Sequence, residues 1–331
     1  MSLRWGILST ANITKKLLGS GHDQQFVAVG SRDLGRAQAF ASEHGLARAH
    51  GSYEELLADP EVDAIYNPLP NSLHVEWSIK ALEAGKHVLC EKPMSRHPED
   101  VERAFDVAER EGRVLEEAFM WRHHPQVART RELIAAGDIG DLRVIRAAFA
   151  FVAADPNDIR LQADLDGGGL MDVGCYCVSG CRTLASAEPV RGYAELIRSR
   201  PPTPQGLPGN GGVDIVLAAT LRFPGDVVAH FDCGVSYVGG DQLEAVGSEG
   251  SVFLDDPWHG REAVIELRRN GNVERIETGR ANSYALELAD FEAAVRGEDP
   301  PLLTRADAVA QARAIEALYT SAERNVPCPI G

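Results

Sequence analysis

The stretch His87-Val88-Leu89-Cys90-Glu91-Lys92-Pro93 is an apolar strand pattern followed at once by a polar turn. A short apolar run bounded by turn residues is typical of a strand buried on both faces of a parallel sheet. A helical pattern over residues 74–84 precedes it, and Gly85 is a natural end for that helix. The stretch therefore predicts a helix, a strand and a turn in the order that a parallel sheet with crossover helices requires.

The same alternation extends over the first 120 residues. Apolar runs predict strands over residues 5–8, 26–29, 62–66, 87–90 and 114–118. Patterns with helical spacing predict helices over residues 13–18, 33–44, 53–57, 74–84 and 98–111. Ser52 and Glu55 have the spacing of a capping box at the start of the third of these helices. We therefore predict an α/β fold with a Rossmann-type, dinucleotide-binding parallel-sheet domain over residues 1–120.

The rest of the chain, residues 121–331, has a different pattern. At 331 residues the chain exceeds the size at which one core usually keeps growing, so we expect a second domain. Short strand-like segments at regular spacing are consistent with an antiparallel meander, with an expected loop over residues 201–212. Those segments cover residues 143–152, 190–197, 214–223, 227–233, 242–246, 251–254, 264–268 and 273–278. Helical patterns over residues 285–296 and 306–321 close the chain.

Composition and charge narrow the class of partner. With 44% apolar and 25% charged residues, the chain has the composition of a soluble globular protein. Its formal net charge of -16 argues against nucleic acid and against an anionic membrane surface, because both require a basic footprint. The sequence shows neither a signal-peptide pattern nor a run of about 18 apolar residues. We therefore expect a cytoplasmic protein that acts on a small molecule.

The six cysteines form no C-x-x-C pair and have no nearby His-x-x-x-His motif. Free cysteine is often a small buried hydrophobe, so we expect packing roles and no metal site.

Polar turns follow the predicted strands of the first domain. In an open parallel sheet, ligands bind at the carboxyl ends of the strands, where such turns converge. The first turn also leads into a helix N-terminus, which favours a pyrophosphate. We therefore predict a dinucleotide site. Its candidate residues are Ser9, Thr10, Ala11, Asn12, Ile13, Ser31, Arg32, Arg36, Asn67, Pro68, Leu69, Asn71, His74, Glu91 and Lys92.

The first two turns depart from the usual NAD pattern. Ser9, Ala11 and Thr14 stand where the glycine fingerprint G-x-G-x-x-G/A is expected. The second strand is followed by Ser31-Arg32 in place of a ribose-binding acid, and a guanidinium suits a 2′-phosphate. We therefore predict NADP as the favoured cofactor, with NAD possible. In the helix after this turn, Arg36 either adds positive charge beside Arg32 or is a solvated helix residue. Asp33 caps the same helix. His74 either lines the cofactor or is an ordinary first-turn residue.

A second motif follows a glycine run at residues 167–169. It reads Asp172-Val173-Gly174-Cys175-Tyr176, and its acid and tyrosine are four positions apart. On a helix that spacing places both side chains on one face. A lysine beside a tyrosine favours the phenolate, which can take the proton of an alcohol. Together with Lys92, the motif predicts a sugar dehydrogenase site.

Several further segments carry a family resemblance. They are Pro70-Asn71-Ser72-Leu73-His74, Ala84-Gly85-Lys86-His87-Val88, Glu91-Lys92-Pro93, the segment 167–176 and Asp290-Phe291-Glu292-Ala293-Ala294-Val295. Nearly end to end, the chain resembles the Gfo/Idh/MocA oxidoreductases. Residues 5–13, 117–122 and 170–176 resemble the branch that holds NADP-dependent D-xylose dehydrogenases and dimeric dihydrodiol dehydrogenases.

The resemblance implies an α+β second domain with a large, mostly antiparallel open sheet, which often forms a homodimer or homotetramer interface. It implies Lys92, Asp172 and Tyr176 as the catalytic residues, with Arg160 also near the substrate. Trp121 and Arg122 either contact the cofactor or pack as a hinge. The resemblance suggests a cis bond between Lys92 and Pro93, whereas the residues alone favour trans.

The function expected from this resemblance is hydride transfer between NADP and a sugar or cyclic polyol. Oxidation of a D-xylose-like aldose at C1, with Tyr176 as the acid-base residue, is the first choice. Reduction of a 1,5-anhydrofructose-like ketosugar and oxidation of a trans-dihydrodiol would use the same groups. A dinucleotide-sensing regulator without turnover is the alternative of another class.

Overall fold

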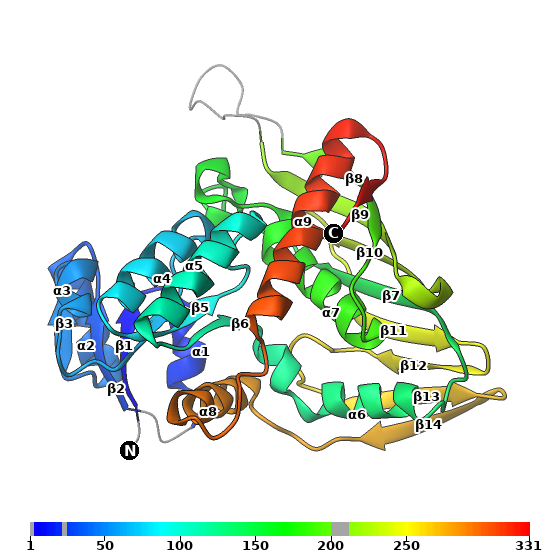
Figure 1. Cartoon of the computed structure of the whole chain (residues 1–331), viewed down its shortest axis with the longest axis horizontal. Helices are drawn as coiled ribbons and strands as arrows, with labels where there is room; N and C mark the ends of the chain where they lie inside the picture. Colours follow the sequence, from blue (N-terminus) through cyan, green and yellow to red (C-terminus); the bar gives the residue numbers. More distant parts are fainter. Residues whose placement is uncertain (1–2, 22–24, 200–211) are drawn as a thin grey trace. The chain divides into compact units, whose positions relative to one another are not determined.

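The computed structural model describes residues 3–21, 25–199 and 212–331 of the chain (Figure 1). These residues form two compact units. The first unit consists of Met1–Met120 and Tyr284–Val309, and the second of Trp121–Ser283 and Ala310–Gly331. The sequence had placed residues 121–331 in one second domain, whereas the segment Tyr284–Val309 belongs to the first unit.

The first unit contains a six-stranded parallel sheet with the strand order β3-β2-β1-β4-β5-β6. This is the order of a Rossmann fold, with the switch point between β1 and β4. The strands are β1 (Arg4–Leu8), β2 (Gln25–Gly30), β3 (Arg48–His50), β4 (Ala64–Asn67), β5 (His87–Glu91) and β6 (Leu115–Ala118). The predicted parallel-sheet fold is confirmed, and β3 is the one strand of this sheet that the sequence analysis missed.

Helices cover both faces of this sheet, and α4 and α5 lie side by side on one of them (Figure 1). The helices are α1 (Thr14–Leu18), α2 (Leu34–His44), α3 (Tyr53–Leu57), α4 (His74–Glu83), α5 (Pro98–Glu111) and α8 (Ser283–Arg296). Asp33 caps α2 by accepting from the Arg36 amide at 3.1 Å, and Ser52 caps α3 by accepting from the Glu55 amide at 3.1 Å. Both predicted caps are therefore present.

The core of the first unit joins distant parts of the sequence. Trp5 of β1 is fully buried, and its ring lies 5.1 Å from that of Phe291 in α8. The Trp5 indole also donates to Glu292 at 3.3 Å. Because α8 contributes Leu288 and Phe291 to the same buried cluster as β1, β2 and β4, it completes this core.

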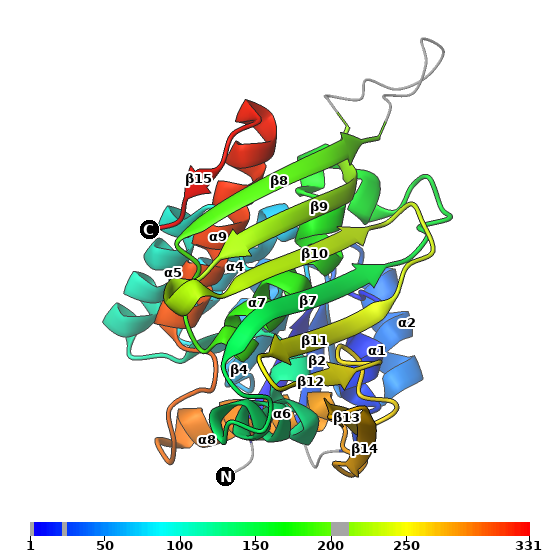
Figure 2. The same cartoon turned by 90° about the vertical axis from the view of Figure 1, so that its right-hand side faces the viewer.

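The second unit is built on a nine-stranded sheet with the order β14-β13-β12-β11-β7-β10-β9-β8-β15 (Figure 2). Its strands are β7 (Leu142–Ala150), β8 (Arg191–Arg198), β9 (Asp214–Arg222), β10 (Val228–Gly234), β11 (Asp241–Gly247), β12 (Gly250–Leu254), β13 (Val264–Arg269), β14 (Asn272–Glu277) and β15 (Cys328–Pro329). The sheet is antiparallel except where β7 pairs with β10. The predicted large, mostly antiparallel sheet is confirmed, but a simple meander is wrong, because β7 inserts between β10 and β11.

Helices cover one face of this sheet and leave the other open (Figure 2). The helices of the second unit are α6 (Pro125–Ala135) and α7 (Cys175–Ala185), and α9 (Arg305–Arg324) continues into it from the first unit. Helix α7 packs on β7, the central strand of the sheet. The expected loop over residues 201–212 lies outside the described residues except for Gly212.

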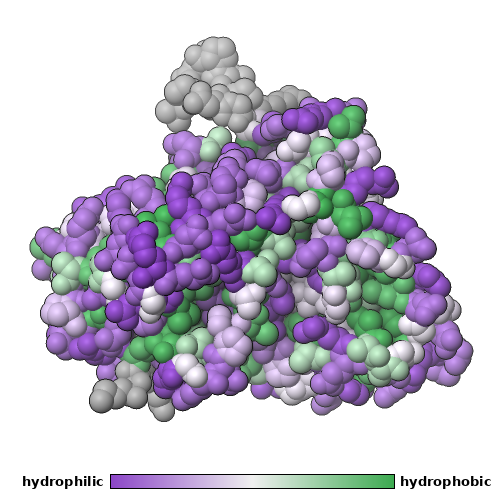
Figure 3. All heavy atoms as spheres, viewed as in Figure 1, coloured by the Kyte–Doolittle hydropathy of each residue, from purple (hydrophilic) through white to green (hydrophobic). Residues whose placement is uncertain are grey.

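Hydrophilic residues predominate over α4 and α5 in the view of Figure 3. In the described part of the chain, no helix combines the length and the apolar character that crossing a membrane requires.

Candidate active site

The turn after β1 begins with a residue in the left-handed region of backbone conformation. Ser9 has φ +86°, a left-handed conformation that explains why the fingerprint usually has glycine here. The Ser9 amide donates to the Gly30 carbonyl at 2.8 Å, which ties the ends of β1 and β2 together. Thr10, Ala11, Asn12 and Ile13 then lead into the five-residue helix α1.

The end of β2 presents a hydroxyl and a guanidinium. The Ser31 amide donates to the His50 carbonyl at 3.1 Å, and the Ser31 Oγ accepts from the Asp33 amide at 3.3 Å. Because this Oγ acts as an acceptor there, its own O–H can donate to an oxyanion. Arg32 and Arg36 are exposed, and the carboxylate of Asp33 is used in the helix cap. This end of the strand therefore fits a phosphorylated ribose better than a free ribose hydroxyl.

Two predicted cofactor residues in the turn after β4 have structural side chains. Asn67 is fully buried, and its Nδ2 donates to the His74 carbonyl at 3.0 Å and to the Ser78 hydroxyl at 3.1 Å. The His74 ring is buried, with Nδ1 2.9 Å from the Pro93 carbonyl and Nε2 2.7 Å from the Leu69 carbonyl. Of the two alternatives for His74, these contacts favour an ordinary residue in the first turn of the helix, because both ring nitrogens face backbone carbonyls.

His74 connects two turns that were predicted to bind the cofactor. Burial lowers its pKa to about 4, although the carbonyls of Pro93 and Leu69 act in the opposite direction. A neutral imidazole carries one N–H, so it donates to one of these carbonyls at a time. Neighbouring Pro68 and Leu69 are buried, and Asn71 is half-buried at the start of the next helical turn.

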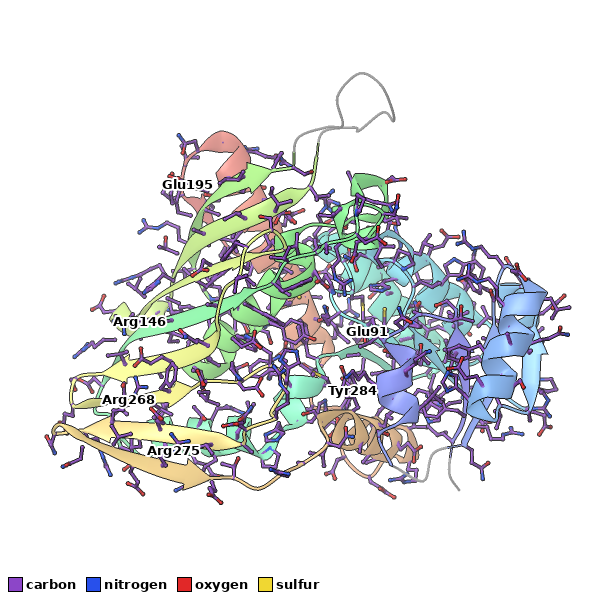
Figure 4. All side chains as sticks on the ribbon, turned by 180° about the vertical axis from the view of Figure 1, so that it is seen from behind. Glu91, Arg146, Glu195, Arg268, Arg275 and Tyr284 are labelled. Carbon is purple, nitrogen blue, oxygen red and sulfur yellow. The ribbon has the colours of Figure 1, made fainter. Side chains whose placement is uncertain are left out.

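The Glu91-Lys92-Pro93 turn at the end of β5 is held by a tyrosine from β4. The Tyr66 hydroxyl donates to Glu91 Oε1 at 2.5 Å, and the Lys92 amide donates to Glu91 Oε2 at 3.3 Å. Burial and the negative charge of Glu91 raise the pKa of Tyr66 well above its usual range, so Tyr66 stays a donor. The bond between Lys92 and Pro93 is cis. Glu91 is labelled in Figure 4.

In the second unit, the glycine run before Asp172 lies against Asp214 of β9. Gly168 has φ +131°, and a side chain there would collide with the Asp214 carboxylate. That carboxylate accepts from the Leu170 amide at 2.7 Å and from the Tyr319 hydroxyl at 2.8 Å. Burial raises the pKa of Asp214, and these two donors oppose the shift. Asp214 and Tyr319 therefore anchor the segment that carries Asp172.

Asp172 lies in a π-helical segment, Leu170–Gly174, directly before α7. Such segments are rare and often occur at functional sites. The Arg160 Nε donates to Asp172 Oδ2 at 2.6 Å, and Arg160 Nη1 lies 3.2 Å from Asp158 Oδ1. Burial disfavours the charge of Arg160, but Asp172 and Asp158 raise its pKa above the usual value. The structure therefore brings together Asp172 and Arg160, two residues that the sequence predicted near the substrate.

Tyr176 lies in the first turn of α7, within a group of aromatic rings. Its ring meets Phe149 edge to face, with centroids 5.4 Å apart, and lies 5.9 Å from Trp258. Trp258 is nearly fully buried and its indole donates to the Ala148 carbonyl at 3.0 Å. These contacts restrict the direction of the Tyr176 hydroxyl. The sequence missed Phe149 and Trp258, because nothing in their local pattern marks them as neighbours of Tyr176.

Trp121 and Arg122 differ in their surroundings. Trp121 is buried and packs edge to face on Trp258, with ring centroids 5.1 Å apart. Arg122 is half-buried. Packing of Trp121 within the second unit fits the hinge alternative better than direct cofactor contact.

All six cysteines are free and buried. Burial raises the pKa of Cys90, Cys177, Cys181 and Cys233, so these thiols are poor nucleophiles and metal ligands at neutral pH.

One group in the second unit has the residue types of a metal site. Asp241, Asp256 and His259 lie close enough together to share an ion. However, Arg261 Nη2 lies 3.3 Å from Asp241 Oδ2 and 3.2 Å from Asp256 Oδ1. The guanidinium supplies the positive charge that a metal would otherwise provide, so this group is an ion-pair cluster.

The close approach at Gly168 can be tested by substitution. Gly168→Ala should lower the free energy of unfolding by about 2–4 kcal/mol, because it adds backbone strain to a collision with Asp214. The measurement is urea unfolding followed by circular dichroism. Gly271→Ala is the matched control, since Gly271 has φ +77° but open space around it, and about 1 kcal/mol is expected there. Equal losses in both variants would contradict the anchoring role of Asp214.

Comparison with known proteins places this geometry in a family. Residues 4–119 match the Gfo/Idh/MocA oxidoreductase family model for an NAD-binding Rossmann fold, and residues 127–253 match the C-terminal domain of the same family. The chain is 35% identical over 330 residues to D-xylose 1-dehydrogenase (NADP(+)) 2 of Haloferax volcanii, covering 97% of this chain and 98% of that protein.

Two further relatives differ in substrate. The chain is 35% identical over 276 residues to trans-1,2-dihydrobenzene-1,2-diol dehydrogenase of Mus musculus, covering 81% of this chain and 79% of that protein. The crystal structure of KijD10, a 3-ketoreductase from Actinomadura kijaniata in complex with NADP and TDP-benzene, superposes with a TM-score of 0.88 at 29% identity, covering 97% and 98% of the two chains. The resemblance found in the sequence is confirmed: the chain is an NAD(P)-dependent oxidoreductase and belongs to the Gfo/Idh/MocA family.

Proposed function

We propose that this protein is an NADP-preferring oxidoreductase that acts on the CH–OH group of a sugar or cyclic polyol, most naturally on C1 of an aldose such as D-xylose. The observation that carries the proposal is the segment that leads into α7, where Asp172 is paired with Arg160 at 2.6 Å and Tyr176 follows within an aromatic cluster. A carboxylate and a guanidinium together can accept and donate hydrogen bonds to several hydroxyl groups. Such a pair favours a polyhydroxylated substrate.

Three side chains share the proposed chemistry. A bound nicotinamide supplies a hydride acceptor or donor at C4. Tyr176 takes the proton of the substrate hydroxyl during oxidation and returns it during reduction. The ammonium of Lys92 favours the phenolate form of the tyrosine and contacts the reacting hydroxyl. Asp172 orients the sugar.

The preference for NADP rests on the end of β2. Arg32 is exposed beside the Ser31 hydroxyl, and the carboxylate of Asp33 caps α2. A guanidinium binds a phosphate through paired donors, whereas an acid at this position would repel it. The KijD10 structure contains NADP, and the Haloferax volcanii relative is named as an NADP(+) enzyme, which supports the same choice.

The test is a substrate panel followed by the absorbance of reduced nicotinamide. Purified protein is mixed with NADP+ or NAD+ and with aldoses, inositols or trans-dihydrodiols, and in the reverse direction with NADPH and ketosugars such as 1,5-anhydrofructose. We expect the fastest turnover with NADP+ and an aldopentose. Turnover confined to ketosugars or dihydrodiols would overturn the aldose assignment. Tight NADPH binding without turnover on any substrate would favour a dinucleotide sensor.

We also propose that the open face of the nine-stranded sheet binds a second copy of the chain, giving a homodimer or a homotetramer. Arg146, Arg268 and Arg275 lie on this face (Figure 4), where they form ion pairs with Glu244 and Glu266 at 2.7–3.4 Å. These five charges are already paired within the chain, so a partner that covers them need not supply their counter-charges. Sedimentation equilibrium should give a multiple of the 35.8 kDa chain mass, and a monomer would contradict the proposal.

A further inference from the structure

Two phenylalanines at the end of β7 contact residues of the proposed substrate site. The Phe149 ring meets Tyr176 edge to face, with centroids 5.4 Å apart. The chain stays extended beyond β7, because the Phe151 amide donates to the Gly234 carbonyl of β10 at 3.1 Å. The Arg160 guanidinium lies 5.6 Å from the centroid of the Phe151 ring. Side chains two positions apart on an extended chain share a face, so this face of the sheet carries both the proposed acid-base residue and the arginine of the proposed sugar site.

His259, in the turn between β12 and β13, lies against the first of these phenylalanines. Its ring meets the Phe149 ring edge to face, with centroids 5.6 Å apart and an interplanar angle of 81°. Because Phe149 contacts both rings, His259 lies no farther from Tyr176 than the sum of the two centroid distances, 5.4 and 5.6 Å. The side chain of His259 is 40% exposed, so a ligand can reach it.

The turn that carries His259 is fixed by packing on both sides. Gln126 is fully buried, and its Nε2 donates to the two successive carbonyls of residues 256–257, at 3.3 and 3.0 Å. Gly260 has φ +62°, and an added Cβ there would lie only 2.7 Å from the His124 ring, so a side chain does not fit. The backbone position of His259 is therefore determined by its buried neighbours.

The imidazole of His259 is held through one of its nitrogens. Nδ1 lies 3.1 Å from Asp241 Oδ2, 3.3 Å from Asp256 Oδ1 and 3.0 Å from Arg261 Nη2. Asp241 is the partner of Phe149 across β11 and β7, so this ion-pair cluster belongs to the same face of the sheet. Nε2 has no hydrogen-bond partner in the part of the chain that the structure describes. A ring held in this way can bond a ligand hydroxyl through Nε2, as donor or acceptor according to its tautomer.

We propose that His259 is a specificity-determining residue that bonds a hydroxyl group of the substrate through Nε2, at a carbon other than the one that is oxidised. Phe149 contacts His259 and Tyr176 and offers the substrate an apolar surface beside them. In a site with aromatic walls, a few well-placed polar groups fix the orientation of the ligand, and His259 adds one to Asp172 and Arg160. The inference rests on the proposed function, because it requires a hydroxylated substrate beside Tyr176.

The test variant is His259→Asn, and the matched variant is His259→Gln. Asparagine places an amide near the position of Nδ1 and nothing at the position of Nε2, whereas the longer glutamine side chain can reach the latter. We expect His259→Asn to raise the KM of the best aldose about three- to tenfold with kcat nearly unchanged, because it removes one hydrogen bond made equally in the ground and transition states. His259→Gln should recover most of this loss. The Kd of NADP+, measured by titration calorimetry, should be the same in both variants, since the proposed contact is with the sugar.

A set of sugars identifies the hydroxyl and separates the contact from a structural effect. The KM of aldopentose epimers and deoxy analogues is measured with the unaltered protein and with His259→Asn. For the analogue that lacks the contacted hydroxyl, the two proteins should have the same KM. An unchanged KM for every sugar, the same rise for every analogue, or equal rises in the Asn and Gln variants would overturn the role of His259. Any of these results with turnover in the unaltered protein leaves the proposed function standing, whereas no turnover of any hydroxylated substrate overturns both.

Discussion

Tyr176→Phe should lower kcat by about 10²- to 10⁴-fold, because it removes the group proposed to take the proton of the substrate hydroxyl. Phenylalanine keeps the ring that packs against Phe149 and Trp258, so the free energy of unfolding should change little. The measurement is kcat with NADP+ and the best substrate of the panel, beside urea unfolding of the same preparation. Binding of NADP+ should also be retained.

The control for this variant is Tyr193→Phe, since Tyr193 is a half-buried tyrosine of β8 whose hydroxyl bonds Glu195 and Asn325, and this variant should have the kcat of the unaltered protein. Retention of more than about a tenth of kcat in Tyr176→Phe would contradict an acid-base role, because general acid-base groups contribute at least 10². A loss of kcat that accompanies a large loss of stability would instead assign Tyr176 to packing.

Lys92→Met should lower kcat by about 10²- to 10³-fold and move the alkaline optimum of the oxidation to higher pH. Methionine is unbranched like lysine but carries no charge, so the variant lacks the ammonium proposed to favour the ionised form of the Tyr176 phenol. The pH dependence of kcat separates this effect from a structural one, since a packing defect would lower kcat without moving the optimum.

The double variant gives a stricter check. If Lys92 and Tyr176 act as one unit, the loss of kcat in the double variant should be close to that of the worse single variant. Losses that multiply would show independent roles and would contradict the proposed coupling. Lys92→Arg should restore part of kcat, because it keeps the positive charge but changes the position of the donors.

The parallel-sheet fold was predictable because its strands are continuous apolar runs between turn residues. β3 was missed because Arg48, Ala49 and His50 form a half-buried edge strand with no apolar pattern. The position of β7 in the second sheet was not predictable for a different reason. Its pairing with β10 joins residues more than 80 positions apart, and spacing along the chain carries no information about such a pairing.

The charged residues of the candidate site could be predicted from the sequence. The residues that hold them in place could be predicted less well. The pairing of Arg160 with Asp172 agrees with the placement of both near the substrate. Asn67 and His74 lie in the predicted turn, but their side chains face the backbone, a direction that a sequence pattern does not show. Asp214 was missed because its contact with the segment before Asp172 spans 44 residues. The one sign of this contact in the sequence is the glycine at position 168, where a side chain would collide with Asp214.

The most direct test of hydride transfer uses D-xylose that carries deuterium at C1, with NADP+ as the cofactor. The reduced cofactor is isolated and its mass measured. The proposed function predicts one deuterium in each molecule of NADPH formed, and a slower reaction than with unlabelled sugar if the transfer limits the rate. Reduced cofactor without deuterium would show that the hydride comes from another carbon, and an absence of reduction would contradict the aldose dehydrogenase assignment.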